Sequence, residues 1–435
     1  MKRNVYEQLI LWKSKKDRMP LVLIGARQVG KTYLLTELGR TAYPDFHTFN
    51  FQEKTVLHQV FEKDLDVRRI IEELSIVQRK DINIQKDLIF FDEVQECSKA
   101  VTSLKYFYEN MPDLHIVSAG SLLGLQLNAL SFPVGKVDIY HLYPMSFEEF
   151  LYATKDTYAI KLFSEMNRSE AAHQLLWQYV CQYFYVGGMP KAVQSWFSDC
   201  GIQEKTSIVR KIQNDILTGF HQDFAKHSGK VNALHISTLM KNVPTQLSNV
   251  QDGSVRRFRF KDVLPNKRTY AHLSSTVSWL DAASLVYKVH IIENRPQIPL
   301  KSYMKENKFK IFLFDVGLLG AMLELSYHDF IHQHYGMMKG FFAENFVACE
   351  LKAMGMTALY SWTQSKSEIE FIYVSKESEI IPIEVKSGKR TKSKSLKSFV
   401  DRYAPKKTIK LVGKVGGNHP DHVVLPLYYA SKIPV

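Results

Sequence analysis

Residues 21–32 read Leu21-Val22-Leu23-Ile24-Gly25-Ala26-Arg27-Gln28-Val29-Gly30-Lys31-Thr32. The first four side chains are apolar, as in a buried strand, and the next eight fit the pattern G-x-x-x-x-G-K-S/T without a mismatch. An amphipathic stretch follows, so the pattern stands between a strand and a helix, which is the context that it requires. The alternative is an ordinary glycine-rich turn.

The loop has the composition of a phosphate-binding turn. Its glycines let the backbone wrap a phosphate, while successive N–H groups and the start of the helix supply positive potential. We expect Lys31 to reach the β- and γ-phosphates of ATP, and Thr32 to bind Mg²⁺. The predicted ATP-binding residues are Gly25, Ala26, Arg27, Gln28, Val29, Gly30, Lys31 and Thr32.

A second element decides against an ordinary turn. The apolar run 88–91 ends in two acids, Asp92 and Glu93. We expect Asp92 to bind Mg²⁺ together with Thr32, and Glu93 to polarise the attacking water beside the γ-phosphate. The sequence therefore predicts MgATP binding and, because both elements are present, an ATPase. Hydrolysis also depends on groups outside these two elements, since a missing arginine can silence a complete motif.

The first 150 residues alternate short apolar runs with amphipathic stretches, which is typical of a parallel α/β sheet. The runs are 21–24, 48–51, 88–91, 115–118 and 137–142. The segment 151–230 carries helical spacing instead. Three short helical patterns and a β-rich stretch at 231–300 fit a winged helix, and strands and a long helix return at 301–435.

Further segments carry a resemblance to a known family. Six of them, together with the phosphate-binding loop, resemble the prokaryotic AAA+-type ATPases of a widespread, largely uncharacterised family with a carboxy-terminal domain of unknown function. These are the tail Asp92-Glu93-Val94-Gln95, the turn Ser118-Ala119-Gly120-Ser121, the run 142–150, and the carboxy-terminal landmarks at 187–190, 314–319 and 344–347. The predicted fold is therefore an AAA+-type α/β core (1–150), a helical lid (151–230), a winged helix (231–300) and a nuclease-like α/β domain (301–435).

The resemblance also implies roles for single residues. It places Ser118 or Ser121 at a sensor position beside the γ-phosphate, with an ordinary turn serine as the alternative. Lys136 stands where the family often has arginine, and lysine lacks the planar fork for bidentate phosphate contacts. The arginine finger therefore stays unassigned. Relatives with this core can assemble in rings, so a homo-oligomer is among the expected partners.

The chain is basic, with a formal net charge of +13, which favours polyanionic partners such as DNA. One cluster precedes a helical pattern at 270–280 that could enter a major groove. The alternative is a winged helix that packs between domains and keeps a solvated basic face. The cluster consists of Arg256, Arg257, Arg259, Lys261, Lys267 and Arg268, and a second basic run follows at 389–414.

Four residues of the last segment, Glu344, Glu370, Glu384 and Lys386, resemble the core of a PD-(D/E)XK nuclease. Because Glu384 and Lys386 are two apart on a predicted strand, they face one side. Three carboxylates could hold Mg²⁺ and activate a water. However, the second acid is glutamate where aspartate is usual, so a local ion-pair network in an inactive domain is the favoured alternative. The domain would then serve to bind a protein partner.

Other site classes have little support. The four cysteines are scattered, which indicates neither a disulfide framework nor a zinc knuckle and fits a reducing cytoplasm. The histidines form no H-E-x-x-H motif, and we expect no histidine-rich metal site. The most apolar later stretch, 116–132, is interrupted by polar residues, so no membrane span is expected.

Overall fold

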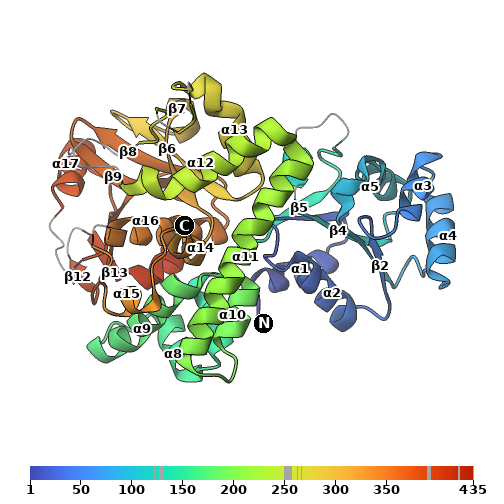
Figure 1. Cartoon of the computed structure of the whole chain (residues 1–435), viewed down its shortest axis with the longest axis horizontal. Helices are drawn as coiled ribbons and strands as arrows, with labels where there is room; N and C mark the ends of the chain where they lie inside the picture. The colour runs from blue at the N-terminus through green and yellow to red at the C-terminus, as the bar shows by residue number, and fades with distance from the viewer. Residues whose placement is uncertain are drawn as a thin grey trace. The chain divides into compact units, whose positions relative to one another are not determined.

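The computed structural model describes residues 1–121, 123–126, 132–248, 257–261, 263–265, 267–336, 338–388, 393–419 and 422–434. The chain forms two compact units (Figure 1). The first, called the ATPase-core unit below, comprises Met1–Tyr143 and Ala282–Ser284. The second, called the C-terminal unit, comprises Pro144–Asp281 and Leu285–Val435. The C-terminal unit contains the segments 151–230 and 301–435 and nearly all of 231–300, which the sequence analysis treats as three domains.

The ATPase-core unit is built on a five-stranded sheet in the order β2-β3-β4-β1-β5, and all its strand pairs are parallel. Each strand lies where an apolar run predicts one, so the predicted parallel α/β core is confirmed. The strands are β1 (Leu21–Ile24), β2 (Phe46–Asn50), β3 (Leu88–Asp92), β4 (His115–Gly120) and β5 (Asp138–His141).

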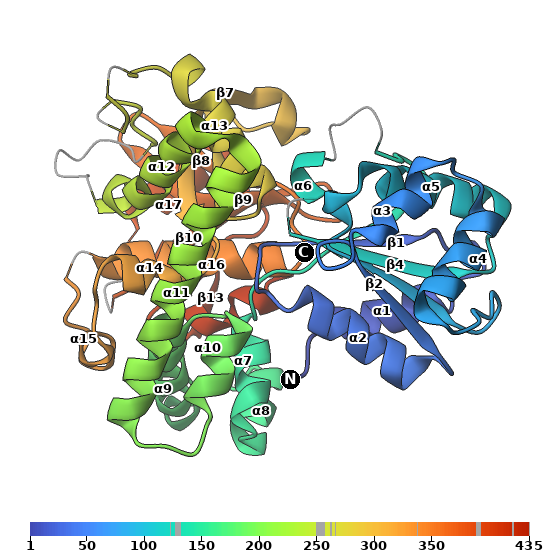
Figure 2. The same cartoon turned by 45° about the vertical axis from the view of Figure 1, so that its right-hand side comes forward.

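Helices cover both faces of this sheet (Figures 1 and 2). One face carries α1 (Val5–Lys13) and α2 (Lys31–Ala42), and the other carries α3 (Val56–Glu62), α4 (Val67–Gln78) and α5 (Ser98–Asn110). Phe49, Phe61, Phe91 and Phe107 pack between the sheet and the second group of helices. Because the strands are parallel, their carboxyl ends meet at one edge, where ligands bind in folds of this kind.

The C-terminal unit begins with a run of helices, as its sequence predicts. Ser146 starts α7 with a capping box, accepting from the Glu149 N–H while the Glu149 carboxylate accepts from the Ser146 N–H. The helices are α7 (Phe147–Thr154), α8 (Thr157–Ser164), α9 (Glu170–Val186), α10 (Pro190–Trp196), α11 (Ile202–Ser228), α12 (Lys230–Ser248) and α13 (Tyr270–Ala282).

An eight-stranded mixed sheet follows, in the order β12-β13-β11-β10-β9-β8-β6-β7. On it, α16 (Met338–Ala353) packs against β10 and α17 (Lys394–Tyr403) against β9. The strands are β6 (Val286–Glu293), β7 (Met304–Leu313), β8 (Leu359–Gln364), β9 (Ser367–Val374), β10 (Ile380–Lys386), β11 (Ile409–Val412), β12 (Gly417–His419) and β13 (His422–Pro426).

The strands after α13 do not form a sheet of their own. β6 pairs antiparallel with β7 and parallel with β8, which lies far along the chain. The β-rich stretch expected in the winged helix forms β6, and β6 belongs to the same sheet as β9 and β10. A further result concerns membranes: no helix in the described parts of the chain is long and apolar enough to cross one.

Buried polar contacts join the landmarks that the sequence singled out. The Gly188 N–H donates to Asp315 Oδ2 at 2.6 Å, and Asp315 also caps α14 (Val316–Met322). Asn345 exchanges two hydrogen bonds with the backbone of Leu313, at 2.8 and 2.9 Å. Glu350 on α16 accepts from the Phe147 N–H at the start of α7, at 2.9 Å. These landmarks therefore connect helices to the sheet.

Candidate functional site

The phosphate-binding loop lies between β1 and α2, and its backbone explains its glycines. A Cβ on Gly25 would lie 2.1 Å from the Leu142 carbonyl oxygen, so no other residue fits there. Gly30 has φ 96°, in the left-handed region that favours glycine. The Lys31 amine donates to the carbonyls of Gly25 and Ala26 at 2.9 and 2.8 Å. Burial lowers the pKa of Lys31 to about 8, although Glu93 and Asp92 oppose the shift.

Thr32 and Asp92 meet at the carboxyl edge of the sheet. The Thr32 hydroxyl lies 3.2 Å from both carboxylate oxygens of Asp92. Asn50, the last residue of β2, donates to Asp92 Oδ2 at 3.5 Å. Burial raises the pKa of Asp92 to about 6, and the negative charge of Glu93 is the second contribution to this rise. Two hard oxygen donors from separate elements thus converge beside the loop.

Glu93 follows β3 with φ 48°, a left-handed conformation that is uncommon for a non-glycine residue. The Gln95 side-chain amide donates to Glu93 Oε2 at 2.6 Å, which holds the carboxylate next to Asp92. Sequence reasoning assigned no role to Gln95 or to Asn50. Gln95 could have been found from its position two residues after Glu93. No neighbouring residue in the sequence indicates that Asn50 contacts Asp92.

The two predicted sensor serines lie in different environments. Ser118 is fully buried within β4, where its hydroxyl donates to the Leu21 carbonyl at 3.1 Å. Ser121 follows the end of β4 and is partly exposed, so it lies at the edge of the sheet. Lys136, at the position where the resembled family often has arginine, pairs with Glu109 at 3.4 Å. A buried arginine that the sequence reasoning missed, Arg3, donates to the carbonyls of Val29 and Tyr143.

In the C-terminal unit, the four nuclease-like residues come from α16, β9 and β10. The Lys386 amine lies 2.5 Å from Glu384 Oε1 and 3.3 Å from Glu370 Oε1. Burial raises the pKa of Glu370 to about 8, and the negative charge of Glu384 is the second contribution to this rise. Burial alone would lower the pKa of Lys386, but the charges of Glu370 and Glu384 hold it above its usual value.

A second lysine, Lys310 on β7, completes this group, which we call the carboxylate–lysine cluster. Its amine lies 3.8 Å from Glu344 Oε2 and pairs with Glu368. Burial would lower the pKa of Lys310, yet the charges of Glu368 and Glu344 raise it. Sequence reasoning missed Lys310 and Glu368 because their pairing joins strands that are distant in sequence. The cluster consists of Lys310, Glu344, Glu368, Glu370, Glu384 and Lys386.

Histidines are more clustered than the sequence analysis recognised. His328 and His332 are four residues apart, and their ring centroids lie 4.1 Å apart, with His334 nearby. Within the described residues, however, only Asp45, His47 and Asp87 bring three ligand atoms within 4.8 Å of one another. The His47 ring nitrogens there contact Gln78 Oε1 and Asp87 Oδ2, and Asp45 pairs with Lys80. These contacts account for that group without an ion.

The basic residues near 256–268 precede α13, which forms where the helical pattern at 270–280 predicts a helix. α13 contains neither lysine nor arginine. Arg257, Arg259 and Lys261 are exposed on the segment that precedes it, as is Arg268. Lys267 is partly exposed beside His235, while Arg256 and part of the second basic run (389–392) lie outside the described residues.

Comparisons with known proteins agree with the geometry of the ATPase-core unit. Residues 17–151 match the family model described as an AAA domain. The ATPase-core unit has an AAA-type P-loop ATPase fold. Residues 178–329 match a domain of unknown function (DUF8612), and residues 339–428 match another (DUF4143). No curated protein matches the chain.

Several solved structures resemble the chain at low identity. The Walker-type ATPase of Pyrococcus abyssi is 12% identical, with 74% of this chain and 95% of that one covered and a TM-score of 0.47. AMPPCP-bound DnaA from Aquifex aeolicus is 13% identical, with 64% and 85% covered and a TM-score of 0.29. The Orc1 protein of Aeropyrum pernix, in complex with DNA, is 14% identical, with 76% and 92% covered and a TM-score of 0.28.

Proposed function

We propose that the protein is a MgATP-dependent ATPase whose nucleotide state controls an action on nucleic acid through its C-terminal unit. The observation that carries the ATPase part is the convergence of Thr32 and Asp92, 3.2 Å apart, beside the loop that holds Lys31. Hydroxyl and carboxylate oxygens are the ligands that Mg²⁺ prefers. When bound, the ion would neutralise phosphate charge, with Thr32 and Asp92 holding it.

The other side chains have separate roles in this proposal. Lys31 exchanges its two carbonyl partners, Gly25 and Ala26, for phosphate oxygens, since an ammonium on an anion gains a charge-assisted hydrogen bond. Glu93 accepts a proton from, or orients, the attacking water. Gln95 keeps the Glu93 carboxylate in place through its 2.6 Å hydrogen bond. Ser121, at the end of β4, is the better-placed of the two sensor candidates because Ser118 is buried in the sheet.

Action on nucleic acid is supported by charge. The formal net charge is +13, and exposed arginines and lysines gather in the segment 257–268. Attraction of such side chains to phosphates is strong at low salt and weakens steeply as salt rises.

A second candidate function is a nucleotide-gated protein-interaction module. The observation that favours it is the presence of two buried or half-buried lysines within the carboxylate–lysine cluster. Lys310 and Lys386 each pair with two of these carboxylates and so offset part of the negative charge that a catalytic Mg²⁺ would otherwise neutralise. We therefore propose that the nuclease-like part binds or packs rather than cuts.

The deciding experiment measures ATP hydrolysis by the full chain with and without single-stranded and duplex DNA, at low and high salt. Lys31→Ala and Glu93→Gln are the site controls, and Glu72→Gln, at an exposed position on α4, is the matched control. We expect turnover that DNA stimulates at low salt and that both site variants lose. Turnover that is indifferent to DNA would leave the ATPase standing and favour the protein-interaction module.

Nuclease activity has a separate test. The full chain is incubated with single-stranded and duplex DNA in Mg²⁺ or Mn²⁺, and we expect the DNA to stay intact. Cleavage that Glu384→Ala abolishes, while ATP binding survives, would instead establish an active metal-dependent nuclease.

A further inference from the structure

The segment 257–261 reads Arg-Phe-Arg-Phe-Lys and lies beside β7, outside regular helix and strand. The Phe258 N–H donates to the Phe309 carbonyl at 2.7 Å, and the two rings stack with centroids 5.3 Å apart. Phe260 packs edge-on against Tyr270 and Phe309. Because side chains alternate along an extended chain, these contacts direct Arg257, Arg259 and Lys261 outward, and all three are exposed.

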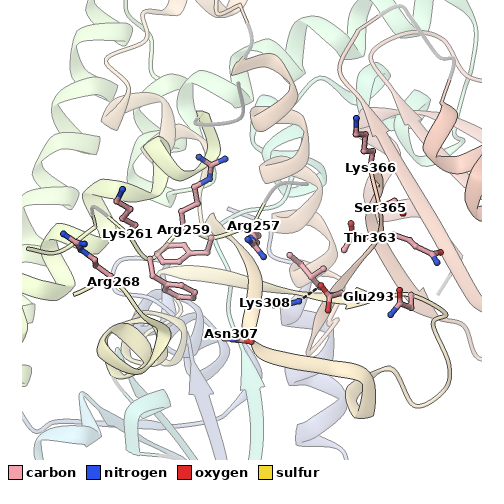
Figure 3. A pocket seen from close by; sticks show the side chains of 15 residues that line it. Arg257, Arg259, Lys261, Arg268, Glu293, Asn307, Lys308, Thr363, Ser365 and Lys366 are labelled. Atoms are coloured by element: carbon pink, nitrogen blue, oxygen red, sulfur yellow. Dashed lines mark hydrogen bonds and ion pairs between the residues drawn. The ribbon is translucent and has the colours of Figure 1, made fainter. Parts of the chain in front are cut away.

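These cations form one wall of a basic pocket of about 1120 Å³ (Figure 3). The turn between β8 and β9 forms the opposite wall with Ser365 and Lys366, and the β6–β7 hairpin contributes Lys308 and Glu293. The described lining residues include a single acid, Glu293, which pairs with Lys305 and Lys308. The cationic lining residues are Arg257, Arg259, Lys261, Arg268, Lys308 and Lys366.

The basic pocket adjoins the carboxylate–lysine cluster. Arg257 and Phe258 line it and also line a small cavity of about 20 Å³. The other walls of that cavity include Lys310 and Glu344 of the cluster. Thr363, which also lines the basic pocket, pairs in the sheet with Glu368. A polyanion in the basic pocket would therefore lie beside the cluster.

We propose that the basic pocket binds a single strand of nucleic acid through its phosphates. Cations two residues apart on an extended chain are roughly 7 Å apart, which is comparable with the separation of successive phosphates in an extended strand. Three of the six cations are arginines, whose planar forks match phosphate oxygens. Phe260 also lines the pocket and is only partly buried, so part of its ring is accessible for a base to stack on.

A single strand fits the arrangement better than a duplex. The cations stand on facing walls, so a strand lying between them contacts both. The contacts reach phosphates and one base face, so we expect little sequence preference. The inference rests on the proposed action on nucleic acid and assigns its place and form.

The test measures fluorescence anisotropy of labelled DNA with the full chain. The probes are a single strand of about 20 nucleotides, longer than the roughly 4–16 that one single-strand-binding module covers, and the matching duplex. The pocket variant is Arg257→Glu/Arg259→Glu/Lys366→Glu. The control carries the same change in charge at exposed helix positions of the C-terminal unit, as Lys161→Glu/Lys191→Glu/Lys211→Glu. Basal ATP hydrolysis, which should persist in both, reports that the ATPase-core unit folds, and urea unfolding curves matched to the wild type report that the C-terminal unit folds.

We expect the wild type to prefer the single strand, the pocket variant to lose at least about tenfold in affinity at 50 mM salt, and the control to stay within about threefold. Equal losses in the pocket variant and the control would overturn the inference while leaving action on nucleic acid intact. A preference for the duplex would overturn its single-strand form. If the wild type binds neither probe, the proposed action on nucleic acid itself fails.

Discussion

Glu93 and Gln95 lie on the short turn after β3, where the backbone passes through a left-handed conformation at Glu93. The carboxylate is therefore placed by a local backbone geometry and by one side-chain hydrogen bond, of 2.6 Å, from Gln95. Gln95 touches the proposed general base and no reacting atom, so it is a positioning residue.

Removing that hydrogen bond should impair catalysis more than binding. We expect Gln95→Ala to lower kcat by roughly tenfold to a hundredfold, because displacement of a catalytic group by about 1 Å costs as much. The KM for ATP should change by less than about threefold. Steady-state kinetics of the wild type, Gln95→Ala and Gln95→Glu measure both constants. Gln95→Glu keeps the length of the side chain but removes the N–H donor of the hydrogen bond to Glu93. A rise in KM with unchanged kcat would show that Gln95 serves nucleotide binding.

At this scale the sequence was informative where function depends on neighbours in the chain. The loop 25–32 and the pair Asp92–Glu93 could be located because their spacing is fixed by a strand and a turn. Asn50 and Lys310 could not, since each acquires its role from a strand that is distant in sequence. For Ser118, the position on a strand was predictable from the sequence. The direction of its hydroxyl, which donates to the Leu21 carbonyl, was not.

Lys310 is the test of whether the carboxylate–lysine cluster stabilises the fold. Replacing this buried cation removes the positive charge that it places beside Glu344 and Glu368, so we expect Lys310→Met to lower the free energy of unfolding by about 3–5 kcal/mol. Urea unfolding measures this change. Lys305→Met, at an exposed position on the same strand, should cost no more than about 1 kcal/mol. Comparable losses in both variants would argue against a structural role for the cluster.

Among the elements, α7 and α16 are joined by a buried carboxylate. Burial raises the pKa of Glu350 to about 8, although the Phe147 N–H opposes the shift. The folded protein therefore holds this proton at pH values where the unfolded chain, with a glutamate pKa of about 4.3, has lost it. Its contribution to stability is fully present below pH of about 4 and is lost progressively as pH rises towards about 8.

Glu350→Gln should remove this dependence, because the amide keeps an acceptor for the Phe147 N–H and cannot ionise. Relative to the wild type, the variant should gain on the order of 2–4 kcal/mol between pH 5 and pH 9. Unfolding monitored by circular dichroism across that range measures the difference. Glu204→Gln, at an exposed position on α11, is the control and should follow the wild type. Parallel curves for the wild type and Glu350→Gln would contradict the assignment.

Element types were predictable along most of the chain. The helical pattern at 270–280 forms α13, and the cations that precede it lie on a segment outside regular helix and strand. That segment reads Arg-Phe-Arg-Phe-Lys, and its period of two suits a chain that lies against a strand. That pattern was visible in the sequence.

For the whole molecule, the order of the segments followed from composition and periodicity, whereas the way they join did not. β6 pairs with β8, which begins after three intervening α-helices, so the segments 231–300 and 301–435 share one sheet. Parallel pairings between distant strands leave no local signal. The division into two units, rather than four, follows from this shared sheet and the buried contacts around it.

A truncation should reveal this interdependence. A chain that ends at residue 300 keeps β6 but loses β7 and β8, the neighbours on both of its sides. We expect this fragment to be aggregated or insoluble under conditions in which the full chain is soluble, because the apolar face of β6 is left uncovered. Size-exclusion chromatography of both proteins measures the outcome. A monodisperse fragment would show that the segment 231–300 folds without the later strands.

The segment 257–261 beside β7 has a consequence for the solubility of the protein. β7 ends the strand order of its sheet, and such an edge strand can recruit another chain by backbone pairing. The Phe258 N–H already donates to one carbonyl on that edge, the carbonyl of Phe309. The exposed cations on either side of Phe258 repel a second copy of the chain that approaches to pair with the edge. The residues that would attract a polyanion therefore also act as gatekeepers against intermolecular β-sheet growth.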